Sequence, residues 1–133
     1  MITRLSHLCL GTRNLPRLIE FYTNGLGCQV VHEFINPAGE LYGVFLSLGG
    51  GSFLEIFNDP TLEPQGGPFR HFCFQVDSRE EVDSRLAALS LSSEWVRGRS
   101  DRTLQCWTSD PDGNKIEFHF YDPESIQFSY IPV

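Results

Sequence analysis

The sequence lacks an excess of positive charge and any long apolar run, and each absence excludes a class of function. Its 133 residues hold 10 lysines and arginines against 17 aspartates and glutamates, a formal net charge of −7. A nucleic-acid-binding face needs a basic excess, so we expect no nucleic-acid partner. No apolar stretch approaches the ~20 residues of a membrane span, and no signal-peptide pattern opens the chain. We therefore expect a cytoplasmic protein with no membrane partner.

The four cysteines also lack the spacing of a disulfide scaffold or of a CxxC motif. They are Cys9, Cys28, Cys73 and Cys106. In a reducing compartment, such thiols are most simply free and buried. The length and the 41% hydrophobic content are those of one globular domain with a core of its own.

What the sequence does contain is an internal repeat. The pattern His-apolar-Cys-apolar begins at His7 (HLCL) and again at His71 (HFCF), and a helix-like stretch follows each copy. Each copy later reaches an apolar strand with one carboxylate, which is Glu55 in the first and Glu117 in the second. The histidine-to-glutamate separations are 48 and 46 residues. Two histidines and two glutamates at matched positions indicate a metal site with four protein ligands.

The first repeat is predicted to contain a strand, a helix and three more strands. Asn14 is the expected helix cap, with Pro16 in the first turn, where its missing N–H costs little. Gly25 is the expected helix stop. The strands, separated by turns rich in glycine and proline, are predicted at residues 5–11, 28–35, 41–48 and 52–58.

The second repeat has the same predicted order. Ser78 and Glu81 form a capping box at the start of its helix. In the turn at residues 110–114, proline presets φ and Gly113 accepts a positive φ. The strands are predicted at residues 69–76, 94–97, 103–109 and 115–121. The chain is thus expected to be one α+β domain (1–133) of two βαβββ modules, residues 1–58 and 69–133, joined by a linker at 59–68.

Strand alternation assigns the histidines to a face of each sheet. His7 and Cys9 share one face in the first repeat, and His71 and Cys73 share the equivalent face in the second. The alternating apolar residues should pack on the helices, which leaves the histidines on the opposite, concave face. A lone histidine there would be an ordinary hydrogen-bonded strand residue. Two at equivalent positions favour a joint role.

The two glutamates support this interpretation unequally. Glu55 lies between Phe53 and Phe57 on its face, where an isolated carboxylate is costly unless it is paired, solvated or metal-bound. An edge strand with Glu55 in water is the simpler alternative. Glu117 shares its face with a lysine and His119, as on an ordinary solvated strand. Its correspondence with Glu55 in the repeat favours the ligand role.

The donor set predicts one divalent metal ion per site. Imidazole and carboxylate together suit Zn²⁺, Ni²⁺, Co²⁺, Fe²⁺ or Mn²⁺. Four ligands around a six-coordinate ion leave two positions for adjacent oxygens of a substrate, whose enolate-like charge the ion would stabilise. Cys9 and Cys73 are alternative soft ligands or substrate contacts, although packing explains them with fewer assumptions.

Three further residues are candidates for substrate binding. His119 and Tyr121 follow Glu117 on the same strand face and could line a pocket. Residues 97–102 are the densest basic cluster of the chain, and Arg99 lies within it. A solvated hairpin loop is the simpler interpretation of this cluster. The alternative is a loop that binds a substrate carboxylate.

Together these residues resemble the vicinal oxygen chelate superfamily, which includes glyoxalase I, extradiol dioxygenases, methylmalonyl-CoA epimerase and fosfomycin-resistance proteins. The resemblance covers nearly the whole chain and depends on residues 6–8, 21–22, 26–27, 53–55, 71 and 110–117. It implies two βαβββ modules that form a curved mixed sheet around a metal. It also implies His7, Glu55, His71 and Glu117 as the metal ligands.

Glutamate at the second ligand position is similar to glyoxalase I. Extradiol dioxygenases and fosfomycin-resistance enzymes use two histidines and one glutamate, and the epimerase has glutamine there. Glu55 therefore favours a glyoxalase-like, metal-dependent lyase or isomerase acting on a small molecule. By that analogy Glu117 and Glu55 are the catalytic residues, with Glu117 moving a proton between neighbouring substrate carbons. The resemblance also implies a homodimer.

Two departures weaken the case for glutathione as part of the substrate. Bacterial glyoxalase I has an arginine four residues after the first histidine, where this chain has Gly11. The family asparagine expected four residues after Glu55 is replaced by Asp59, with Asn58 one position earlier. Two alternatives therefore stay open. One is an Fe(II) extradiol-type dioxygenase without Glu55 as a ligand, and the other is a non-enzymatic binder like the bleomycin-resistance proteins.

Overall fold

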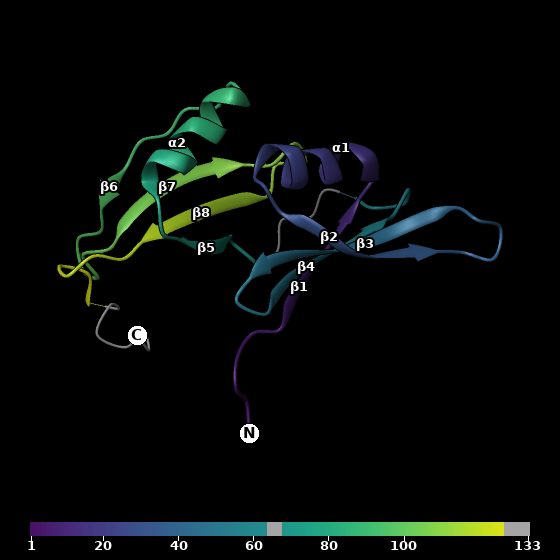
Figure 1. The fold of residues 1–133 in the computed structure, drawn as a ribbon, viewed down its shortest axis with the longest axis horizontal. Coiled ribbons are helices and arrows are strands. Elements are labelled where there is room, and N and C mark those ends of the chain that lie inside the picture. Colours follow the sequence, from purple (N-terminus) through teal and green to yellow (C-terminus); the bar gives the residue numbers. More distant parts are fainter. Residues whose placement is uncertain (64–67, 127–133) are drawn as a thin grey trace. The chain divides into compact units, whose positions relative to one another are not determined.

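The computed structural model describes residues 1–63 and 68–126, and the chain divides into two compact units. The first unit is Met1–Gln65 and the second is Gly66–Val133. Each described unit is built on one four-stranded mixed sheet with a helix on one face (Figure 1). Residues 64–67 of the predicted linker and residues 127–133 lie outside the described part. Among the described residues, no helix is long and apolar enough to cross a membrane.

The first unit has the strand order β1-β4-β3-β2. β1 is parallel to β4, and β3 is antiparallel to both β4 and β2. The elements are β1 (His7–Thr12), α1 (Leu15–Glu20), a π-helical turn (Phe21–Gly25), β2 (Gln29–Ile35), β3 (Leu41–Gly49) and β4 (Ser52–Asn58). The predicted βαβββ order is therefore confirmed, with strand ends displaced by at most two residues.

The helix of the first unit begins as predicted and ends differently. The Asn14 side chain accepts a hydrogen bond from the Arg17 N–H at 3.2 Å, and a proline lies in the first turn. The helix then widens into the π-helical turn, whose last residue is Gly25. The left-handed conformation falls two residues later, at Gly27, where φ is 83°. The widened turn therefore moves the left-handed residue past the glycine that the sequence suggested.

The core of the first unit lies between α1 and one face of the sheet. Val44 and Leu46 of β3 and Leu54 and Ile56 of β4 are at most 1% exposed, and Leu18 of α1 is fully buried. Alternation along β4 places Glu55 on the opposite face. Burial of this apolar face against the helix therefore decides the register that presents the candidate ligands.

The second unit repeats the arrangement with the strand order β5-β8-β7-β6. β5 is parallel to β8, and β7 is antiparallel to β8 and β6. The elements are β5 (Phe72–Val76), α2 (Arg79–Ala88), β6 (Val96–Arg97), β7 (Leu104–Ser109) and β8 (Lys115–Phe120). The predicted order is confirmed, but β5 begins three residues later than expected. His71 therefore directly precedes the strand.

The helix cap and the turn of the second unit have the predicted chemistry with one difference. The Ser78 hydroxyl accepts from the Glu81 N–H at 3.1 Å. The Glu81 carboxylate accepts from Arg85 one turn later, so it pairs along the helix and does not reach back to close the box. In the turn at 110–114, the Gly113 N–H donates to the Asp110 carbonyl at 3.0 Å, with φ of 85° at Gly113.

Candidate metal centre

Each unit brings together one histidine and one glutamate from neighbouring parallel strands. In the first, His7 Nε2 lies 3.8 Å from a carboxylate oxygen of Glu55. In the second, His71 Nε2 lies 3.0 Å from Glu117. His7 is the first residue of β1 and His71 directly precedes β5, and both glutamates lie on the last strand of their unit, which pairs with β1 or β5. The repeat in the sequence is therefore a repeat of an imidazole–carboxylate pair in space.

The first pair lies at the edge of an aromatic surface. The His7 ring meets the Phe45 ring edge-on, with centroids 5.5 Å apart. Phe45 is the register partner of Glu55 on β3. The His7 side chain is 43% exposed and that of Glu55 is 16% exposed. Both ligand candidates are thus accessible from this face of the sheet.

The second pair is more enclosed and contains a third group. The Glu117 side chain is 7% exposed. One carboxylate oxygen faces His71, and the other lies 2.8 Å from Nε2 of His119. A buried carboxylate is costly unless cations or hydrogen bonds compensate it, and here two imidazoles face it. Glu117 therefore lies at the centre of the polar cluster of the second unit.

The candidates His119 and Tyr121 belong to this cluster. Nδ1 of His119 lies 3.3 Å from the Tyr121 hydroxyl. His119 is 8% exposed, and its Nε2 has no hydrogen-bond partner although it lies close to Glu117. The sequence placed His119 on the correct face but did not indicate its burial. No local pattern could have suggested it, because alternation along a strand is the same whether the polar face is solvated or enclosed.

Both candidate cysteines face the glutamates directly. Cys9 is the register partner of Glu55, and Cys73 is the register partner of Glu117. Burial raises the pKa of the Cys9 thiol, and the hydrogen bond to Glu55 and its charge raise it further. Although Cys73 reaches the surface, partial burial and then the Glu117 charge raise its pKa to about 12. Both thiols are therefore protonated at neutral pH.

The expectation of buried cysteines is wrong for most of them. None of the four cysteines forms a disulfide, but only Cys106 is buried. Cys9 and Cys73 are exposed, and Cys28 is intermediate. The reason is that Cys9 and Cys73 lie on the strand faces turned away from the helices.

The described residues also contain a group that could hold a metal ion, formed by Cys73, Glu117 and His119, whose ligand atoms all lie within 4.8 Å of one another.

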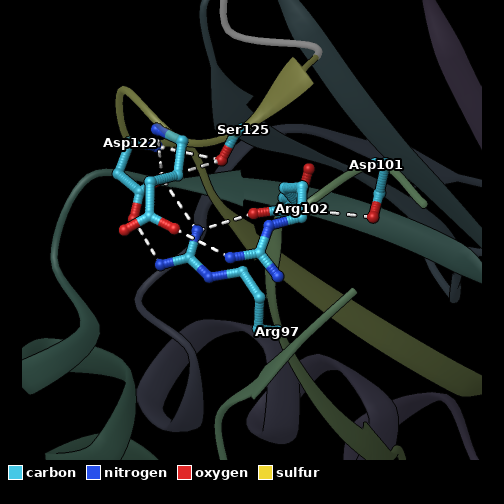
Figure 2. A network of polar contacts seen from close by, with 7 residues as sticks. Arg97, Asp101, Arg102, Asp122 and Ser125 are labelled. Atoms are coloured by element: carbon cyan, nitrogen blue, oxygen red, sulfur yellow. Dashed lines mark hydrogen bonds and ion pairs between the residues drawn. The ribbon is translucent and has the colours of Figure 1, made fainter. Parts of the chain in front are cut away.

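Most of the basic cluster at 97–102 is engaged in the fold (Figure 2). Arg97 donates to both carboxylate oxygens of Asp122, at 2.9 and 2.7 Å, and also to the Arg102 carbonyl. Arg102 pairs with Glu124 at 2.9 Å. Arg99 is exposed and lies between these two paired arginines in the sequence. The loop interpretation thus accounts for Arg97 and Arg102, and a substrate contact through Arg99 stays a prediction.

We expect Asp122→Asn to lower the melting temperature of the second unit at neutral pH, and the difference from wild type to shrink in acid. Hydrogen bonds from Arg97 hold the pKa of Asp122 well below its usual range. The stabilisation is therefore complete above the ordinary value of about 3.9, and it is lost as pH falls through the lower folded pKa. Thermal melts across this range, with Asp77→Asn as an exposed control, measure it. A difference that stays constant into strong acid would contradict the prediction.

Comparison with known proteins identifies the family of this chain. The family model described as the Glyoxalase/Bleomycin resistance protein/Dioxygenase superfamily matches residues 4–118. The trivalent organoarsenical cleaving enzyme of Bacillus sp. (strain MD1) is 33% identical over 131 residues, covering 93% of this chain and 76% of that enzyme. The lactoylglutathione lyase of Neisseria meningitidis serogroup A is 28% identical over 122 residues, covering 86% and 88%.

Solved structures show the same fold. The glyoxalase family protein from Enterococcus faecalis superposes with a TM-score of 0.71 at 26% identity, covering 87% of this chain and 96% of that one. The lactoylglutathione lyase from Agrobacterium tumefaciens superposes with a TM-score of 0.65 at 23% identity, covering 90% and 94%. The chain therefore belongs to the glyoxalase/bleomycin resistance/dioxygenase superfamily, the vicinal oxygen chelate proteins that its repeat resembles.

Proposed function

We propose that this protein is a divalent-metal-dependent lyase or isomerase of a small oxygen-chelating substrate, with His7, Glu55, His71 and Glu117 as the metal ligands. The observation that supports it most is the pairing of imidazole with carboxylate in both units, at 3.8 and 3.0 Å. Relatives that are 28% and 33% identical to this chain are named as a lactoylglutathione lyase and as an organoarsenical cleaving enzyme. Family, repeat and local geometry thus support the same set of four residues.

The residues fit a divalent ion by their chemistry. Two imidazoles and two carboxylates form a donor set typical of Zn²⁺, Ni²⁺, Co²⁺, Fe²⁺ or Mn²⁺. When bound, the ion would stabilise negative charge that develops on substrate oxygens. Glu117 is the stronger candidate for proton transfer, because its enclosed carboxylate is held between His71 and His119. Glu55 is more accessible and would act as its partner.

The surface around the first pair supports a substrate with an apolar or aromatic group. Five aromatic side chains have ring contacts with one another at 5.0 to 5.9 Å between centroids: Phe34, Tyr42, Phe45, Phe53 and Phe57. Gly43 lies opposite Phe57, and a Cβ there would collide with the Phe57 ring. The missing side chain therefore makes room for this aromatic surface.

The same region argues against glutathione. A Cβ placed on Gly11 would lie 3.4 Å from the Leu62 side chain and 3.8 Å from that of Asp59. Among the described residues, the nearest neighbours of this position are thus an apolar and an acidic side chain, and neither is a cation for a glutathione carboxylate. We propose a smaller and less charged substrate than the tripeptide conjugate.

The test of this function combines metal analysis with a substrate panel. Purified protein should hold about one equivalent of divalent metal per site, lose it to a chelator and regain it. Adding the metal back should restore turnover of the adducts that 2-oxoaldehydes form with thiols. Adducts of aromatic 2-oxoaldehydes with small thiols should be preferred over adducts with glutathione. Trivalent organoarsenicals belong in the panel because of the relative named for their cleavage. A chain that never retains divalent metal would overturn the proposal.

The predicted homodimer is tested separately, by light scattering of the purified protein.

An Fe(II) dioxygenase is the second candidate function, and the longer distance between His7 and Glu55 supports it. At 3.8 Å, His7 and Glu55 are not in hydrogen-bond contact, whereas His71 and Glu117 are 3.0 Å apart. Without Glu55, the remaining ligands are two histidines and one carboxylate, which is the ligand set of non-haem Fe(II) oxygenases.

Glu55→Ala separates the two candidates, because alanine offers no donor atom whereas glutamine would keep a carbonyl oxygen at this position. In a four-ligand centre, we expect the substitution to weaken metal binding by about 100-fold or more, because losing a ligand exceeds the 10–100-fold cost of losing an outer partner. In a three-ligand iron centre, affinity should change little and oxygen uptake with catechols should persist. Metal titration and an oxygen electrode measure the two outcomes. Absence of uptake by Fe(II)-loaded protein across a broad catechol panel would exclude the second candidate.

A further inference from the structure

Strand pairing in the second unit puts three different metal-ligating side chains on one face. Cys73 of β5 is the register partner of Glu117 on β8. His119 follows Glu117 by two residues on the same strand, so its side chain points to the same face. A thiol, a carboxylate and an imidazole are thus neighbours within one unit.

The distances suit a single ion. The three ligand atoms lie within 4.8 Å of one another, and Nε2 of His119 is already 2.8 Å from a Glu117 oxygen. A tetrahedral ion with bonds of roughly 2.0–2.3 Å separates its ligand atoms by roughly 3.3–3.8 Å. For one ion, the cluster therefore has to close by about 1 Å at its widest and to open by about 0.5 Å between His119 and Glu117. Side-chain rotation can supply both displacements.

His119 has the arrangement of a metal-ligating histidine. It is 8% exposed, and its Nε2 has no hydrogen-bond partner. Its other ring nitrogen, Nδ1, lies 3.3 Å from the Tyr121 hydroxyl. Histidines that bind metal typically bond through the second ring nitrogen to a polar group, which holds the ring in place. Nε2 of His119 is thus a buried nitrogen that makes no hydrogen bond and lies 2.8 Å from a Glu117 oxygen.

The repeat shows that this cluster is specific to the second unit. Cys9 and Glu55 of the first unit occupy the positions of Cys73 and Glu117. The position equivalent to His119, two residues after the glutamate, is Phe57. The first unit therefore has the thiol and the carboxylate but has no histidine at the position of His119.

We propose that the second unit by itself binds a thiophilic divalent cation, such as Zn²⁺ or Cd²⁺, through Cys73 Sγ, the Glu117 carboxylate and His119 Nε2. One sulfur, one oxygen and one nitrogen form a donor set that suits borderline-soft and soft ions, and the Cys73 thiol releases its proton to solvent as the ion binds. The proposal shares Glu117 with the proposed catalytic centre but uses neither His7 nor Glu55. A thiophilic ion here would compete with the proposed catalytic metal for Glu117.

Cd²⁺ titration of the full-length, metal-free protein under reducing conditions tests the proposal. We expect one equivalent to bind with a near-ultraviolet thiolate-to-metal charge-transfer band. Cys73→Ser should abolish the band, and His119→Gln should keep the band but weaken binding by about tenfold or more. Cys9→Ser is the matched control at the equivalent strand position, and His32→Gln is an exposed control. Neither control should change the band or the affinity, and circular dichroism should show every variant folded.

The variants of the first unit distinguish this site from the proposed catalytic centre. His7→Gln and Glu55→Gln should leave Cd²⁺ affinity and the band unchanged, even if they remove the binding of Ni²⁺ or Fe²⁺. If they weaken Cd²⁺ binding as much as His119→Gln does, the ion lies elsewhere and the proposal is overturned. Persistence of the band in Cys73→Ser would overturn it equally. If the proposed catalytic function proved wrong, the expected effects of Cys73→Ser and His119→Gln on Cd²⁺ binding would not change.

Discussion

Replacing Glu117 with glutamine is expected to weaken divalent-metal binding by more than about 100-fold and to abolish turnover. Glu117 is the enclosed carboxylate of the second unit, 3.0 Å from His71 and 2.8 Å from His119. Glutamine has nearly the same shape, but it lacks the charge that a divalent ion needs and the basicity needed for proton transfer. Calorimetric metal titration and elemental analysis measure the first effect, and the substrate panel measures the second.

The matched control for this substitution is Glu33→Gln. Glu33 is an exposed glutamate of β2 that is not among the candidate ligands, so metal content should not change. Retention of stoichiometric metal and turnover by Glu117→Gln would contradict the assigned role. The same variant separates an enzyme from a non-enzymatic binder of the bleomycin-resistance type. An enzyme should lose turnover, whereas a binder should keep its affinity for the small molecule and has no turnover to lose.

Replacing Leu54 with alanine is expected to destabilise the first unit by about 2–5 kcal/mol. Leu54 is fully buried on β4, between Leu8 of β1 and Leu46 of β3 in the strand register. Removing its side chain leaves a cavity beneath the helix-covered face, which the sheet can fill only in part. Urea unfolding followed by circular dichroism measures the change in free energy of unfolding.

Leu41→Ala is the control of the same chemistry at an exposed strand position. Leu41 is 41% exposed at the start of β3, and the expected change is within about 0.5 kcal/mol. Because Leu54 precedes Glu55, Leu54→Ala should also weaken metal binding by displacing the carboxylate. Equal losses of stability at the two positions would show that the core is not where the structure places it.

The internal repeat in the sequence predicted most of the fold, namely the order of strands and helix in both units. Local patterns predicted the Asn14 cap, the Ser78 cap and the Gly113 turn, because each depends on residues within four positions of one another. Where the prediction failed, the cause was not local. The π-helical turn after α1 moved the left-handed residue from Gly25 to Gly27. β5 began later than expected because only residues from Phe72 onward have pairing partners on β8.

For the site, the sequence by itself determined which side chains share a face. Strand periodicity and the repeat were enough to select His7, Glu55, His71 and Glu117 as candidates. Only the tertiary structure decided how they are held, because distance and burial depend on strand pairing between residues far apart in the chain. Pairing of β5 with β8 set Cys73 opposite Glu117, and burial left Nε2 of His119 facing that carboxylate with no hydrogen-bond partner. Alternation along one strand cannot indicate this, since it is the same for a solvated strand and for an enclosed one.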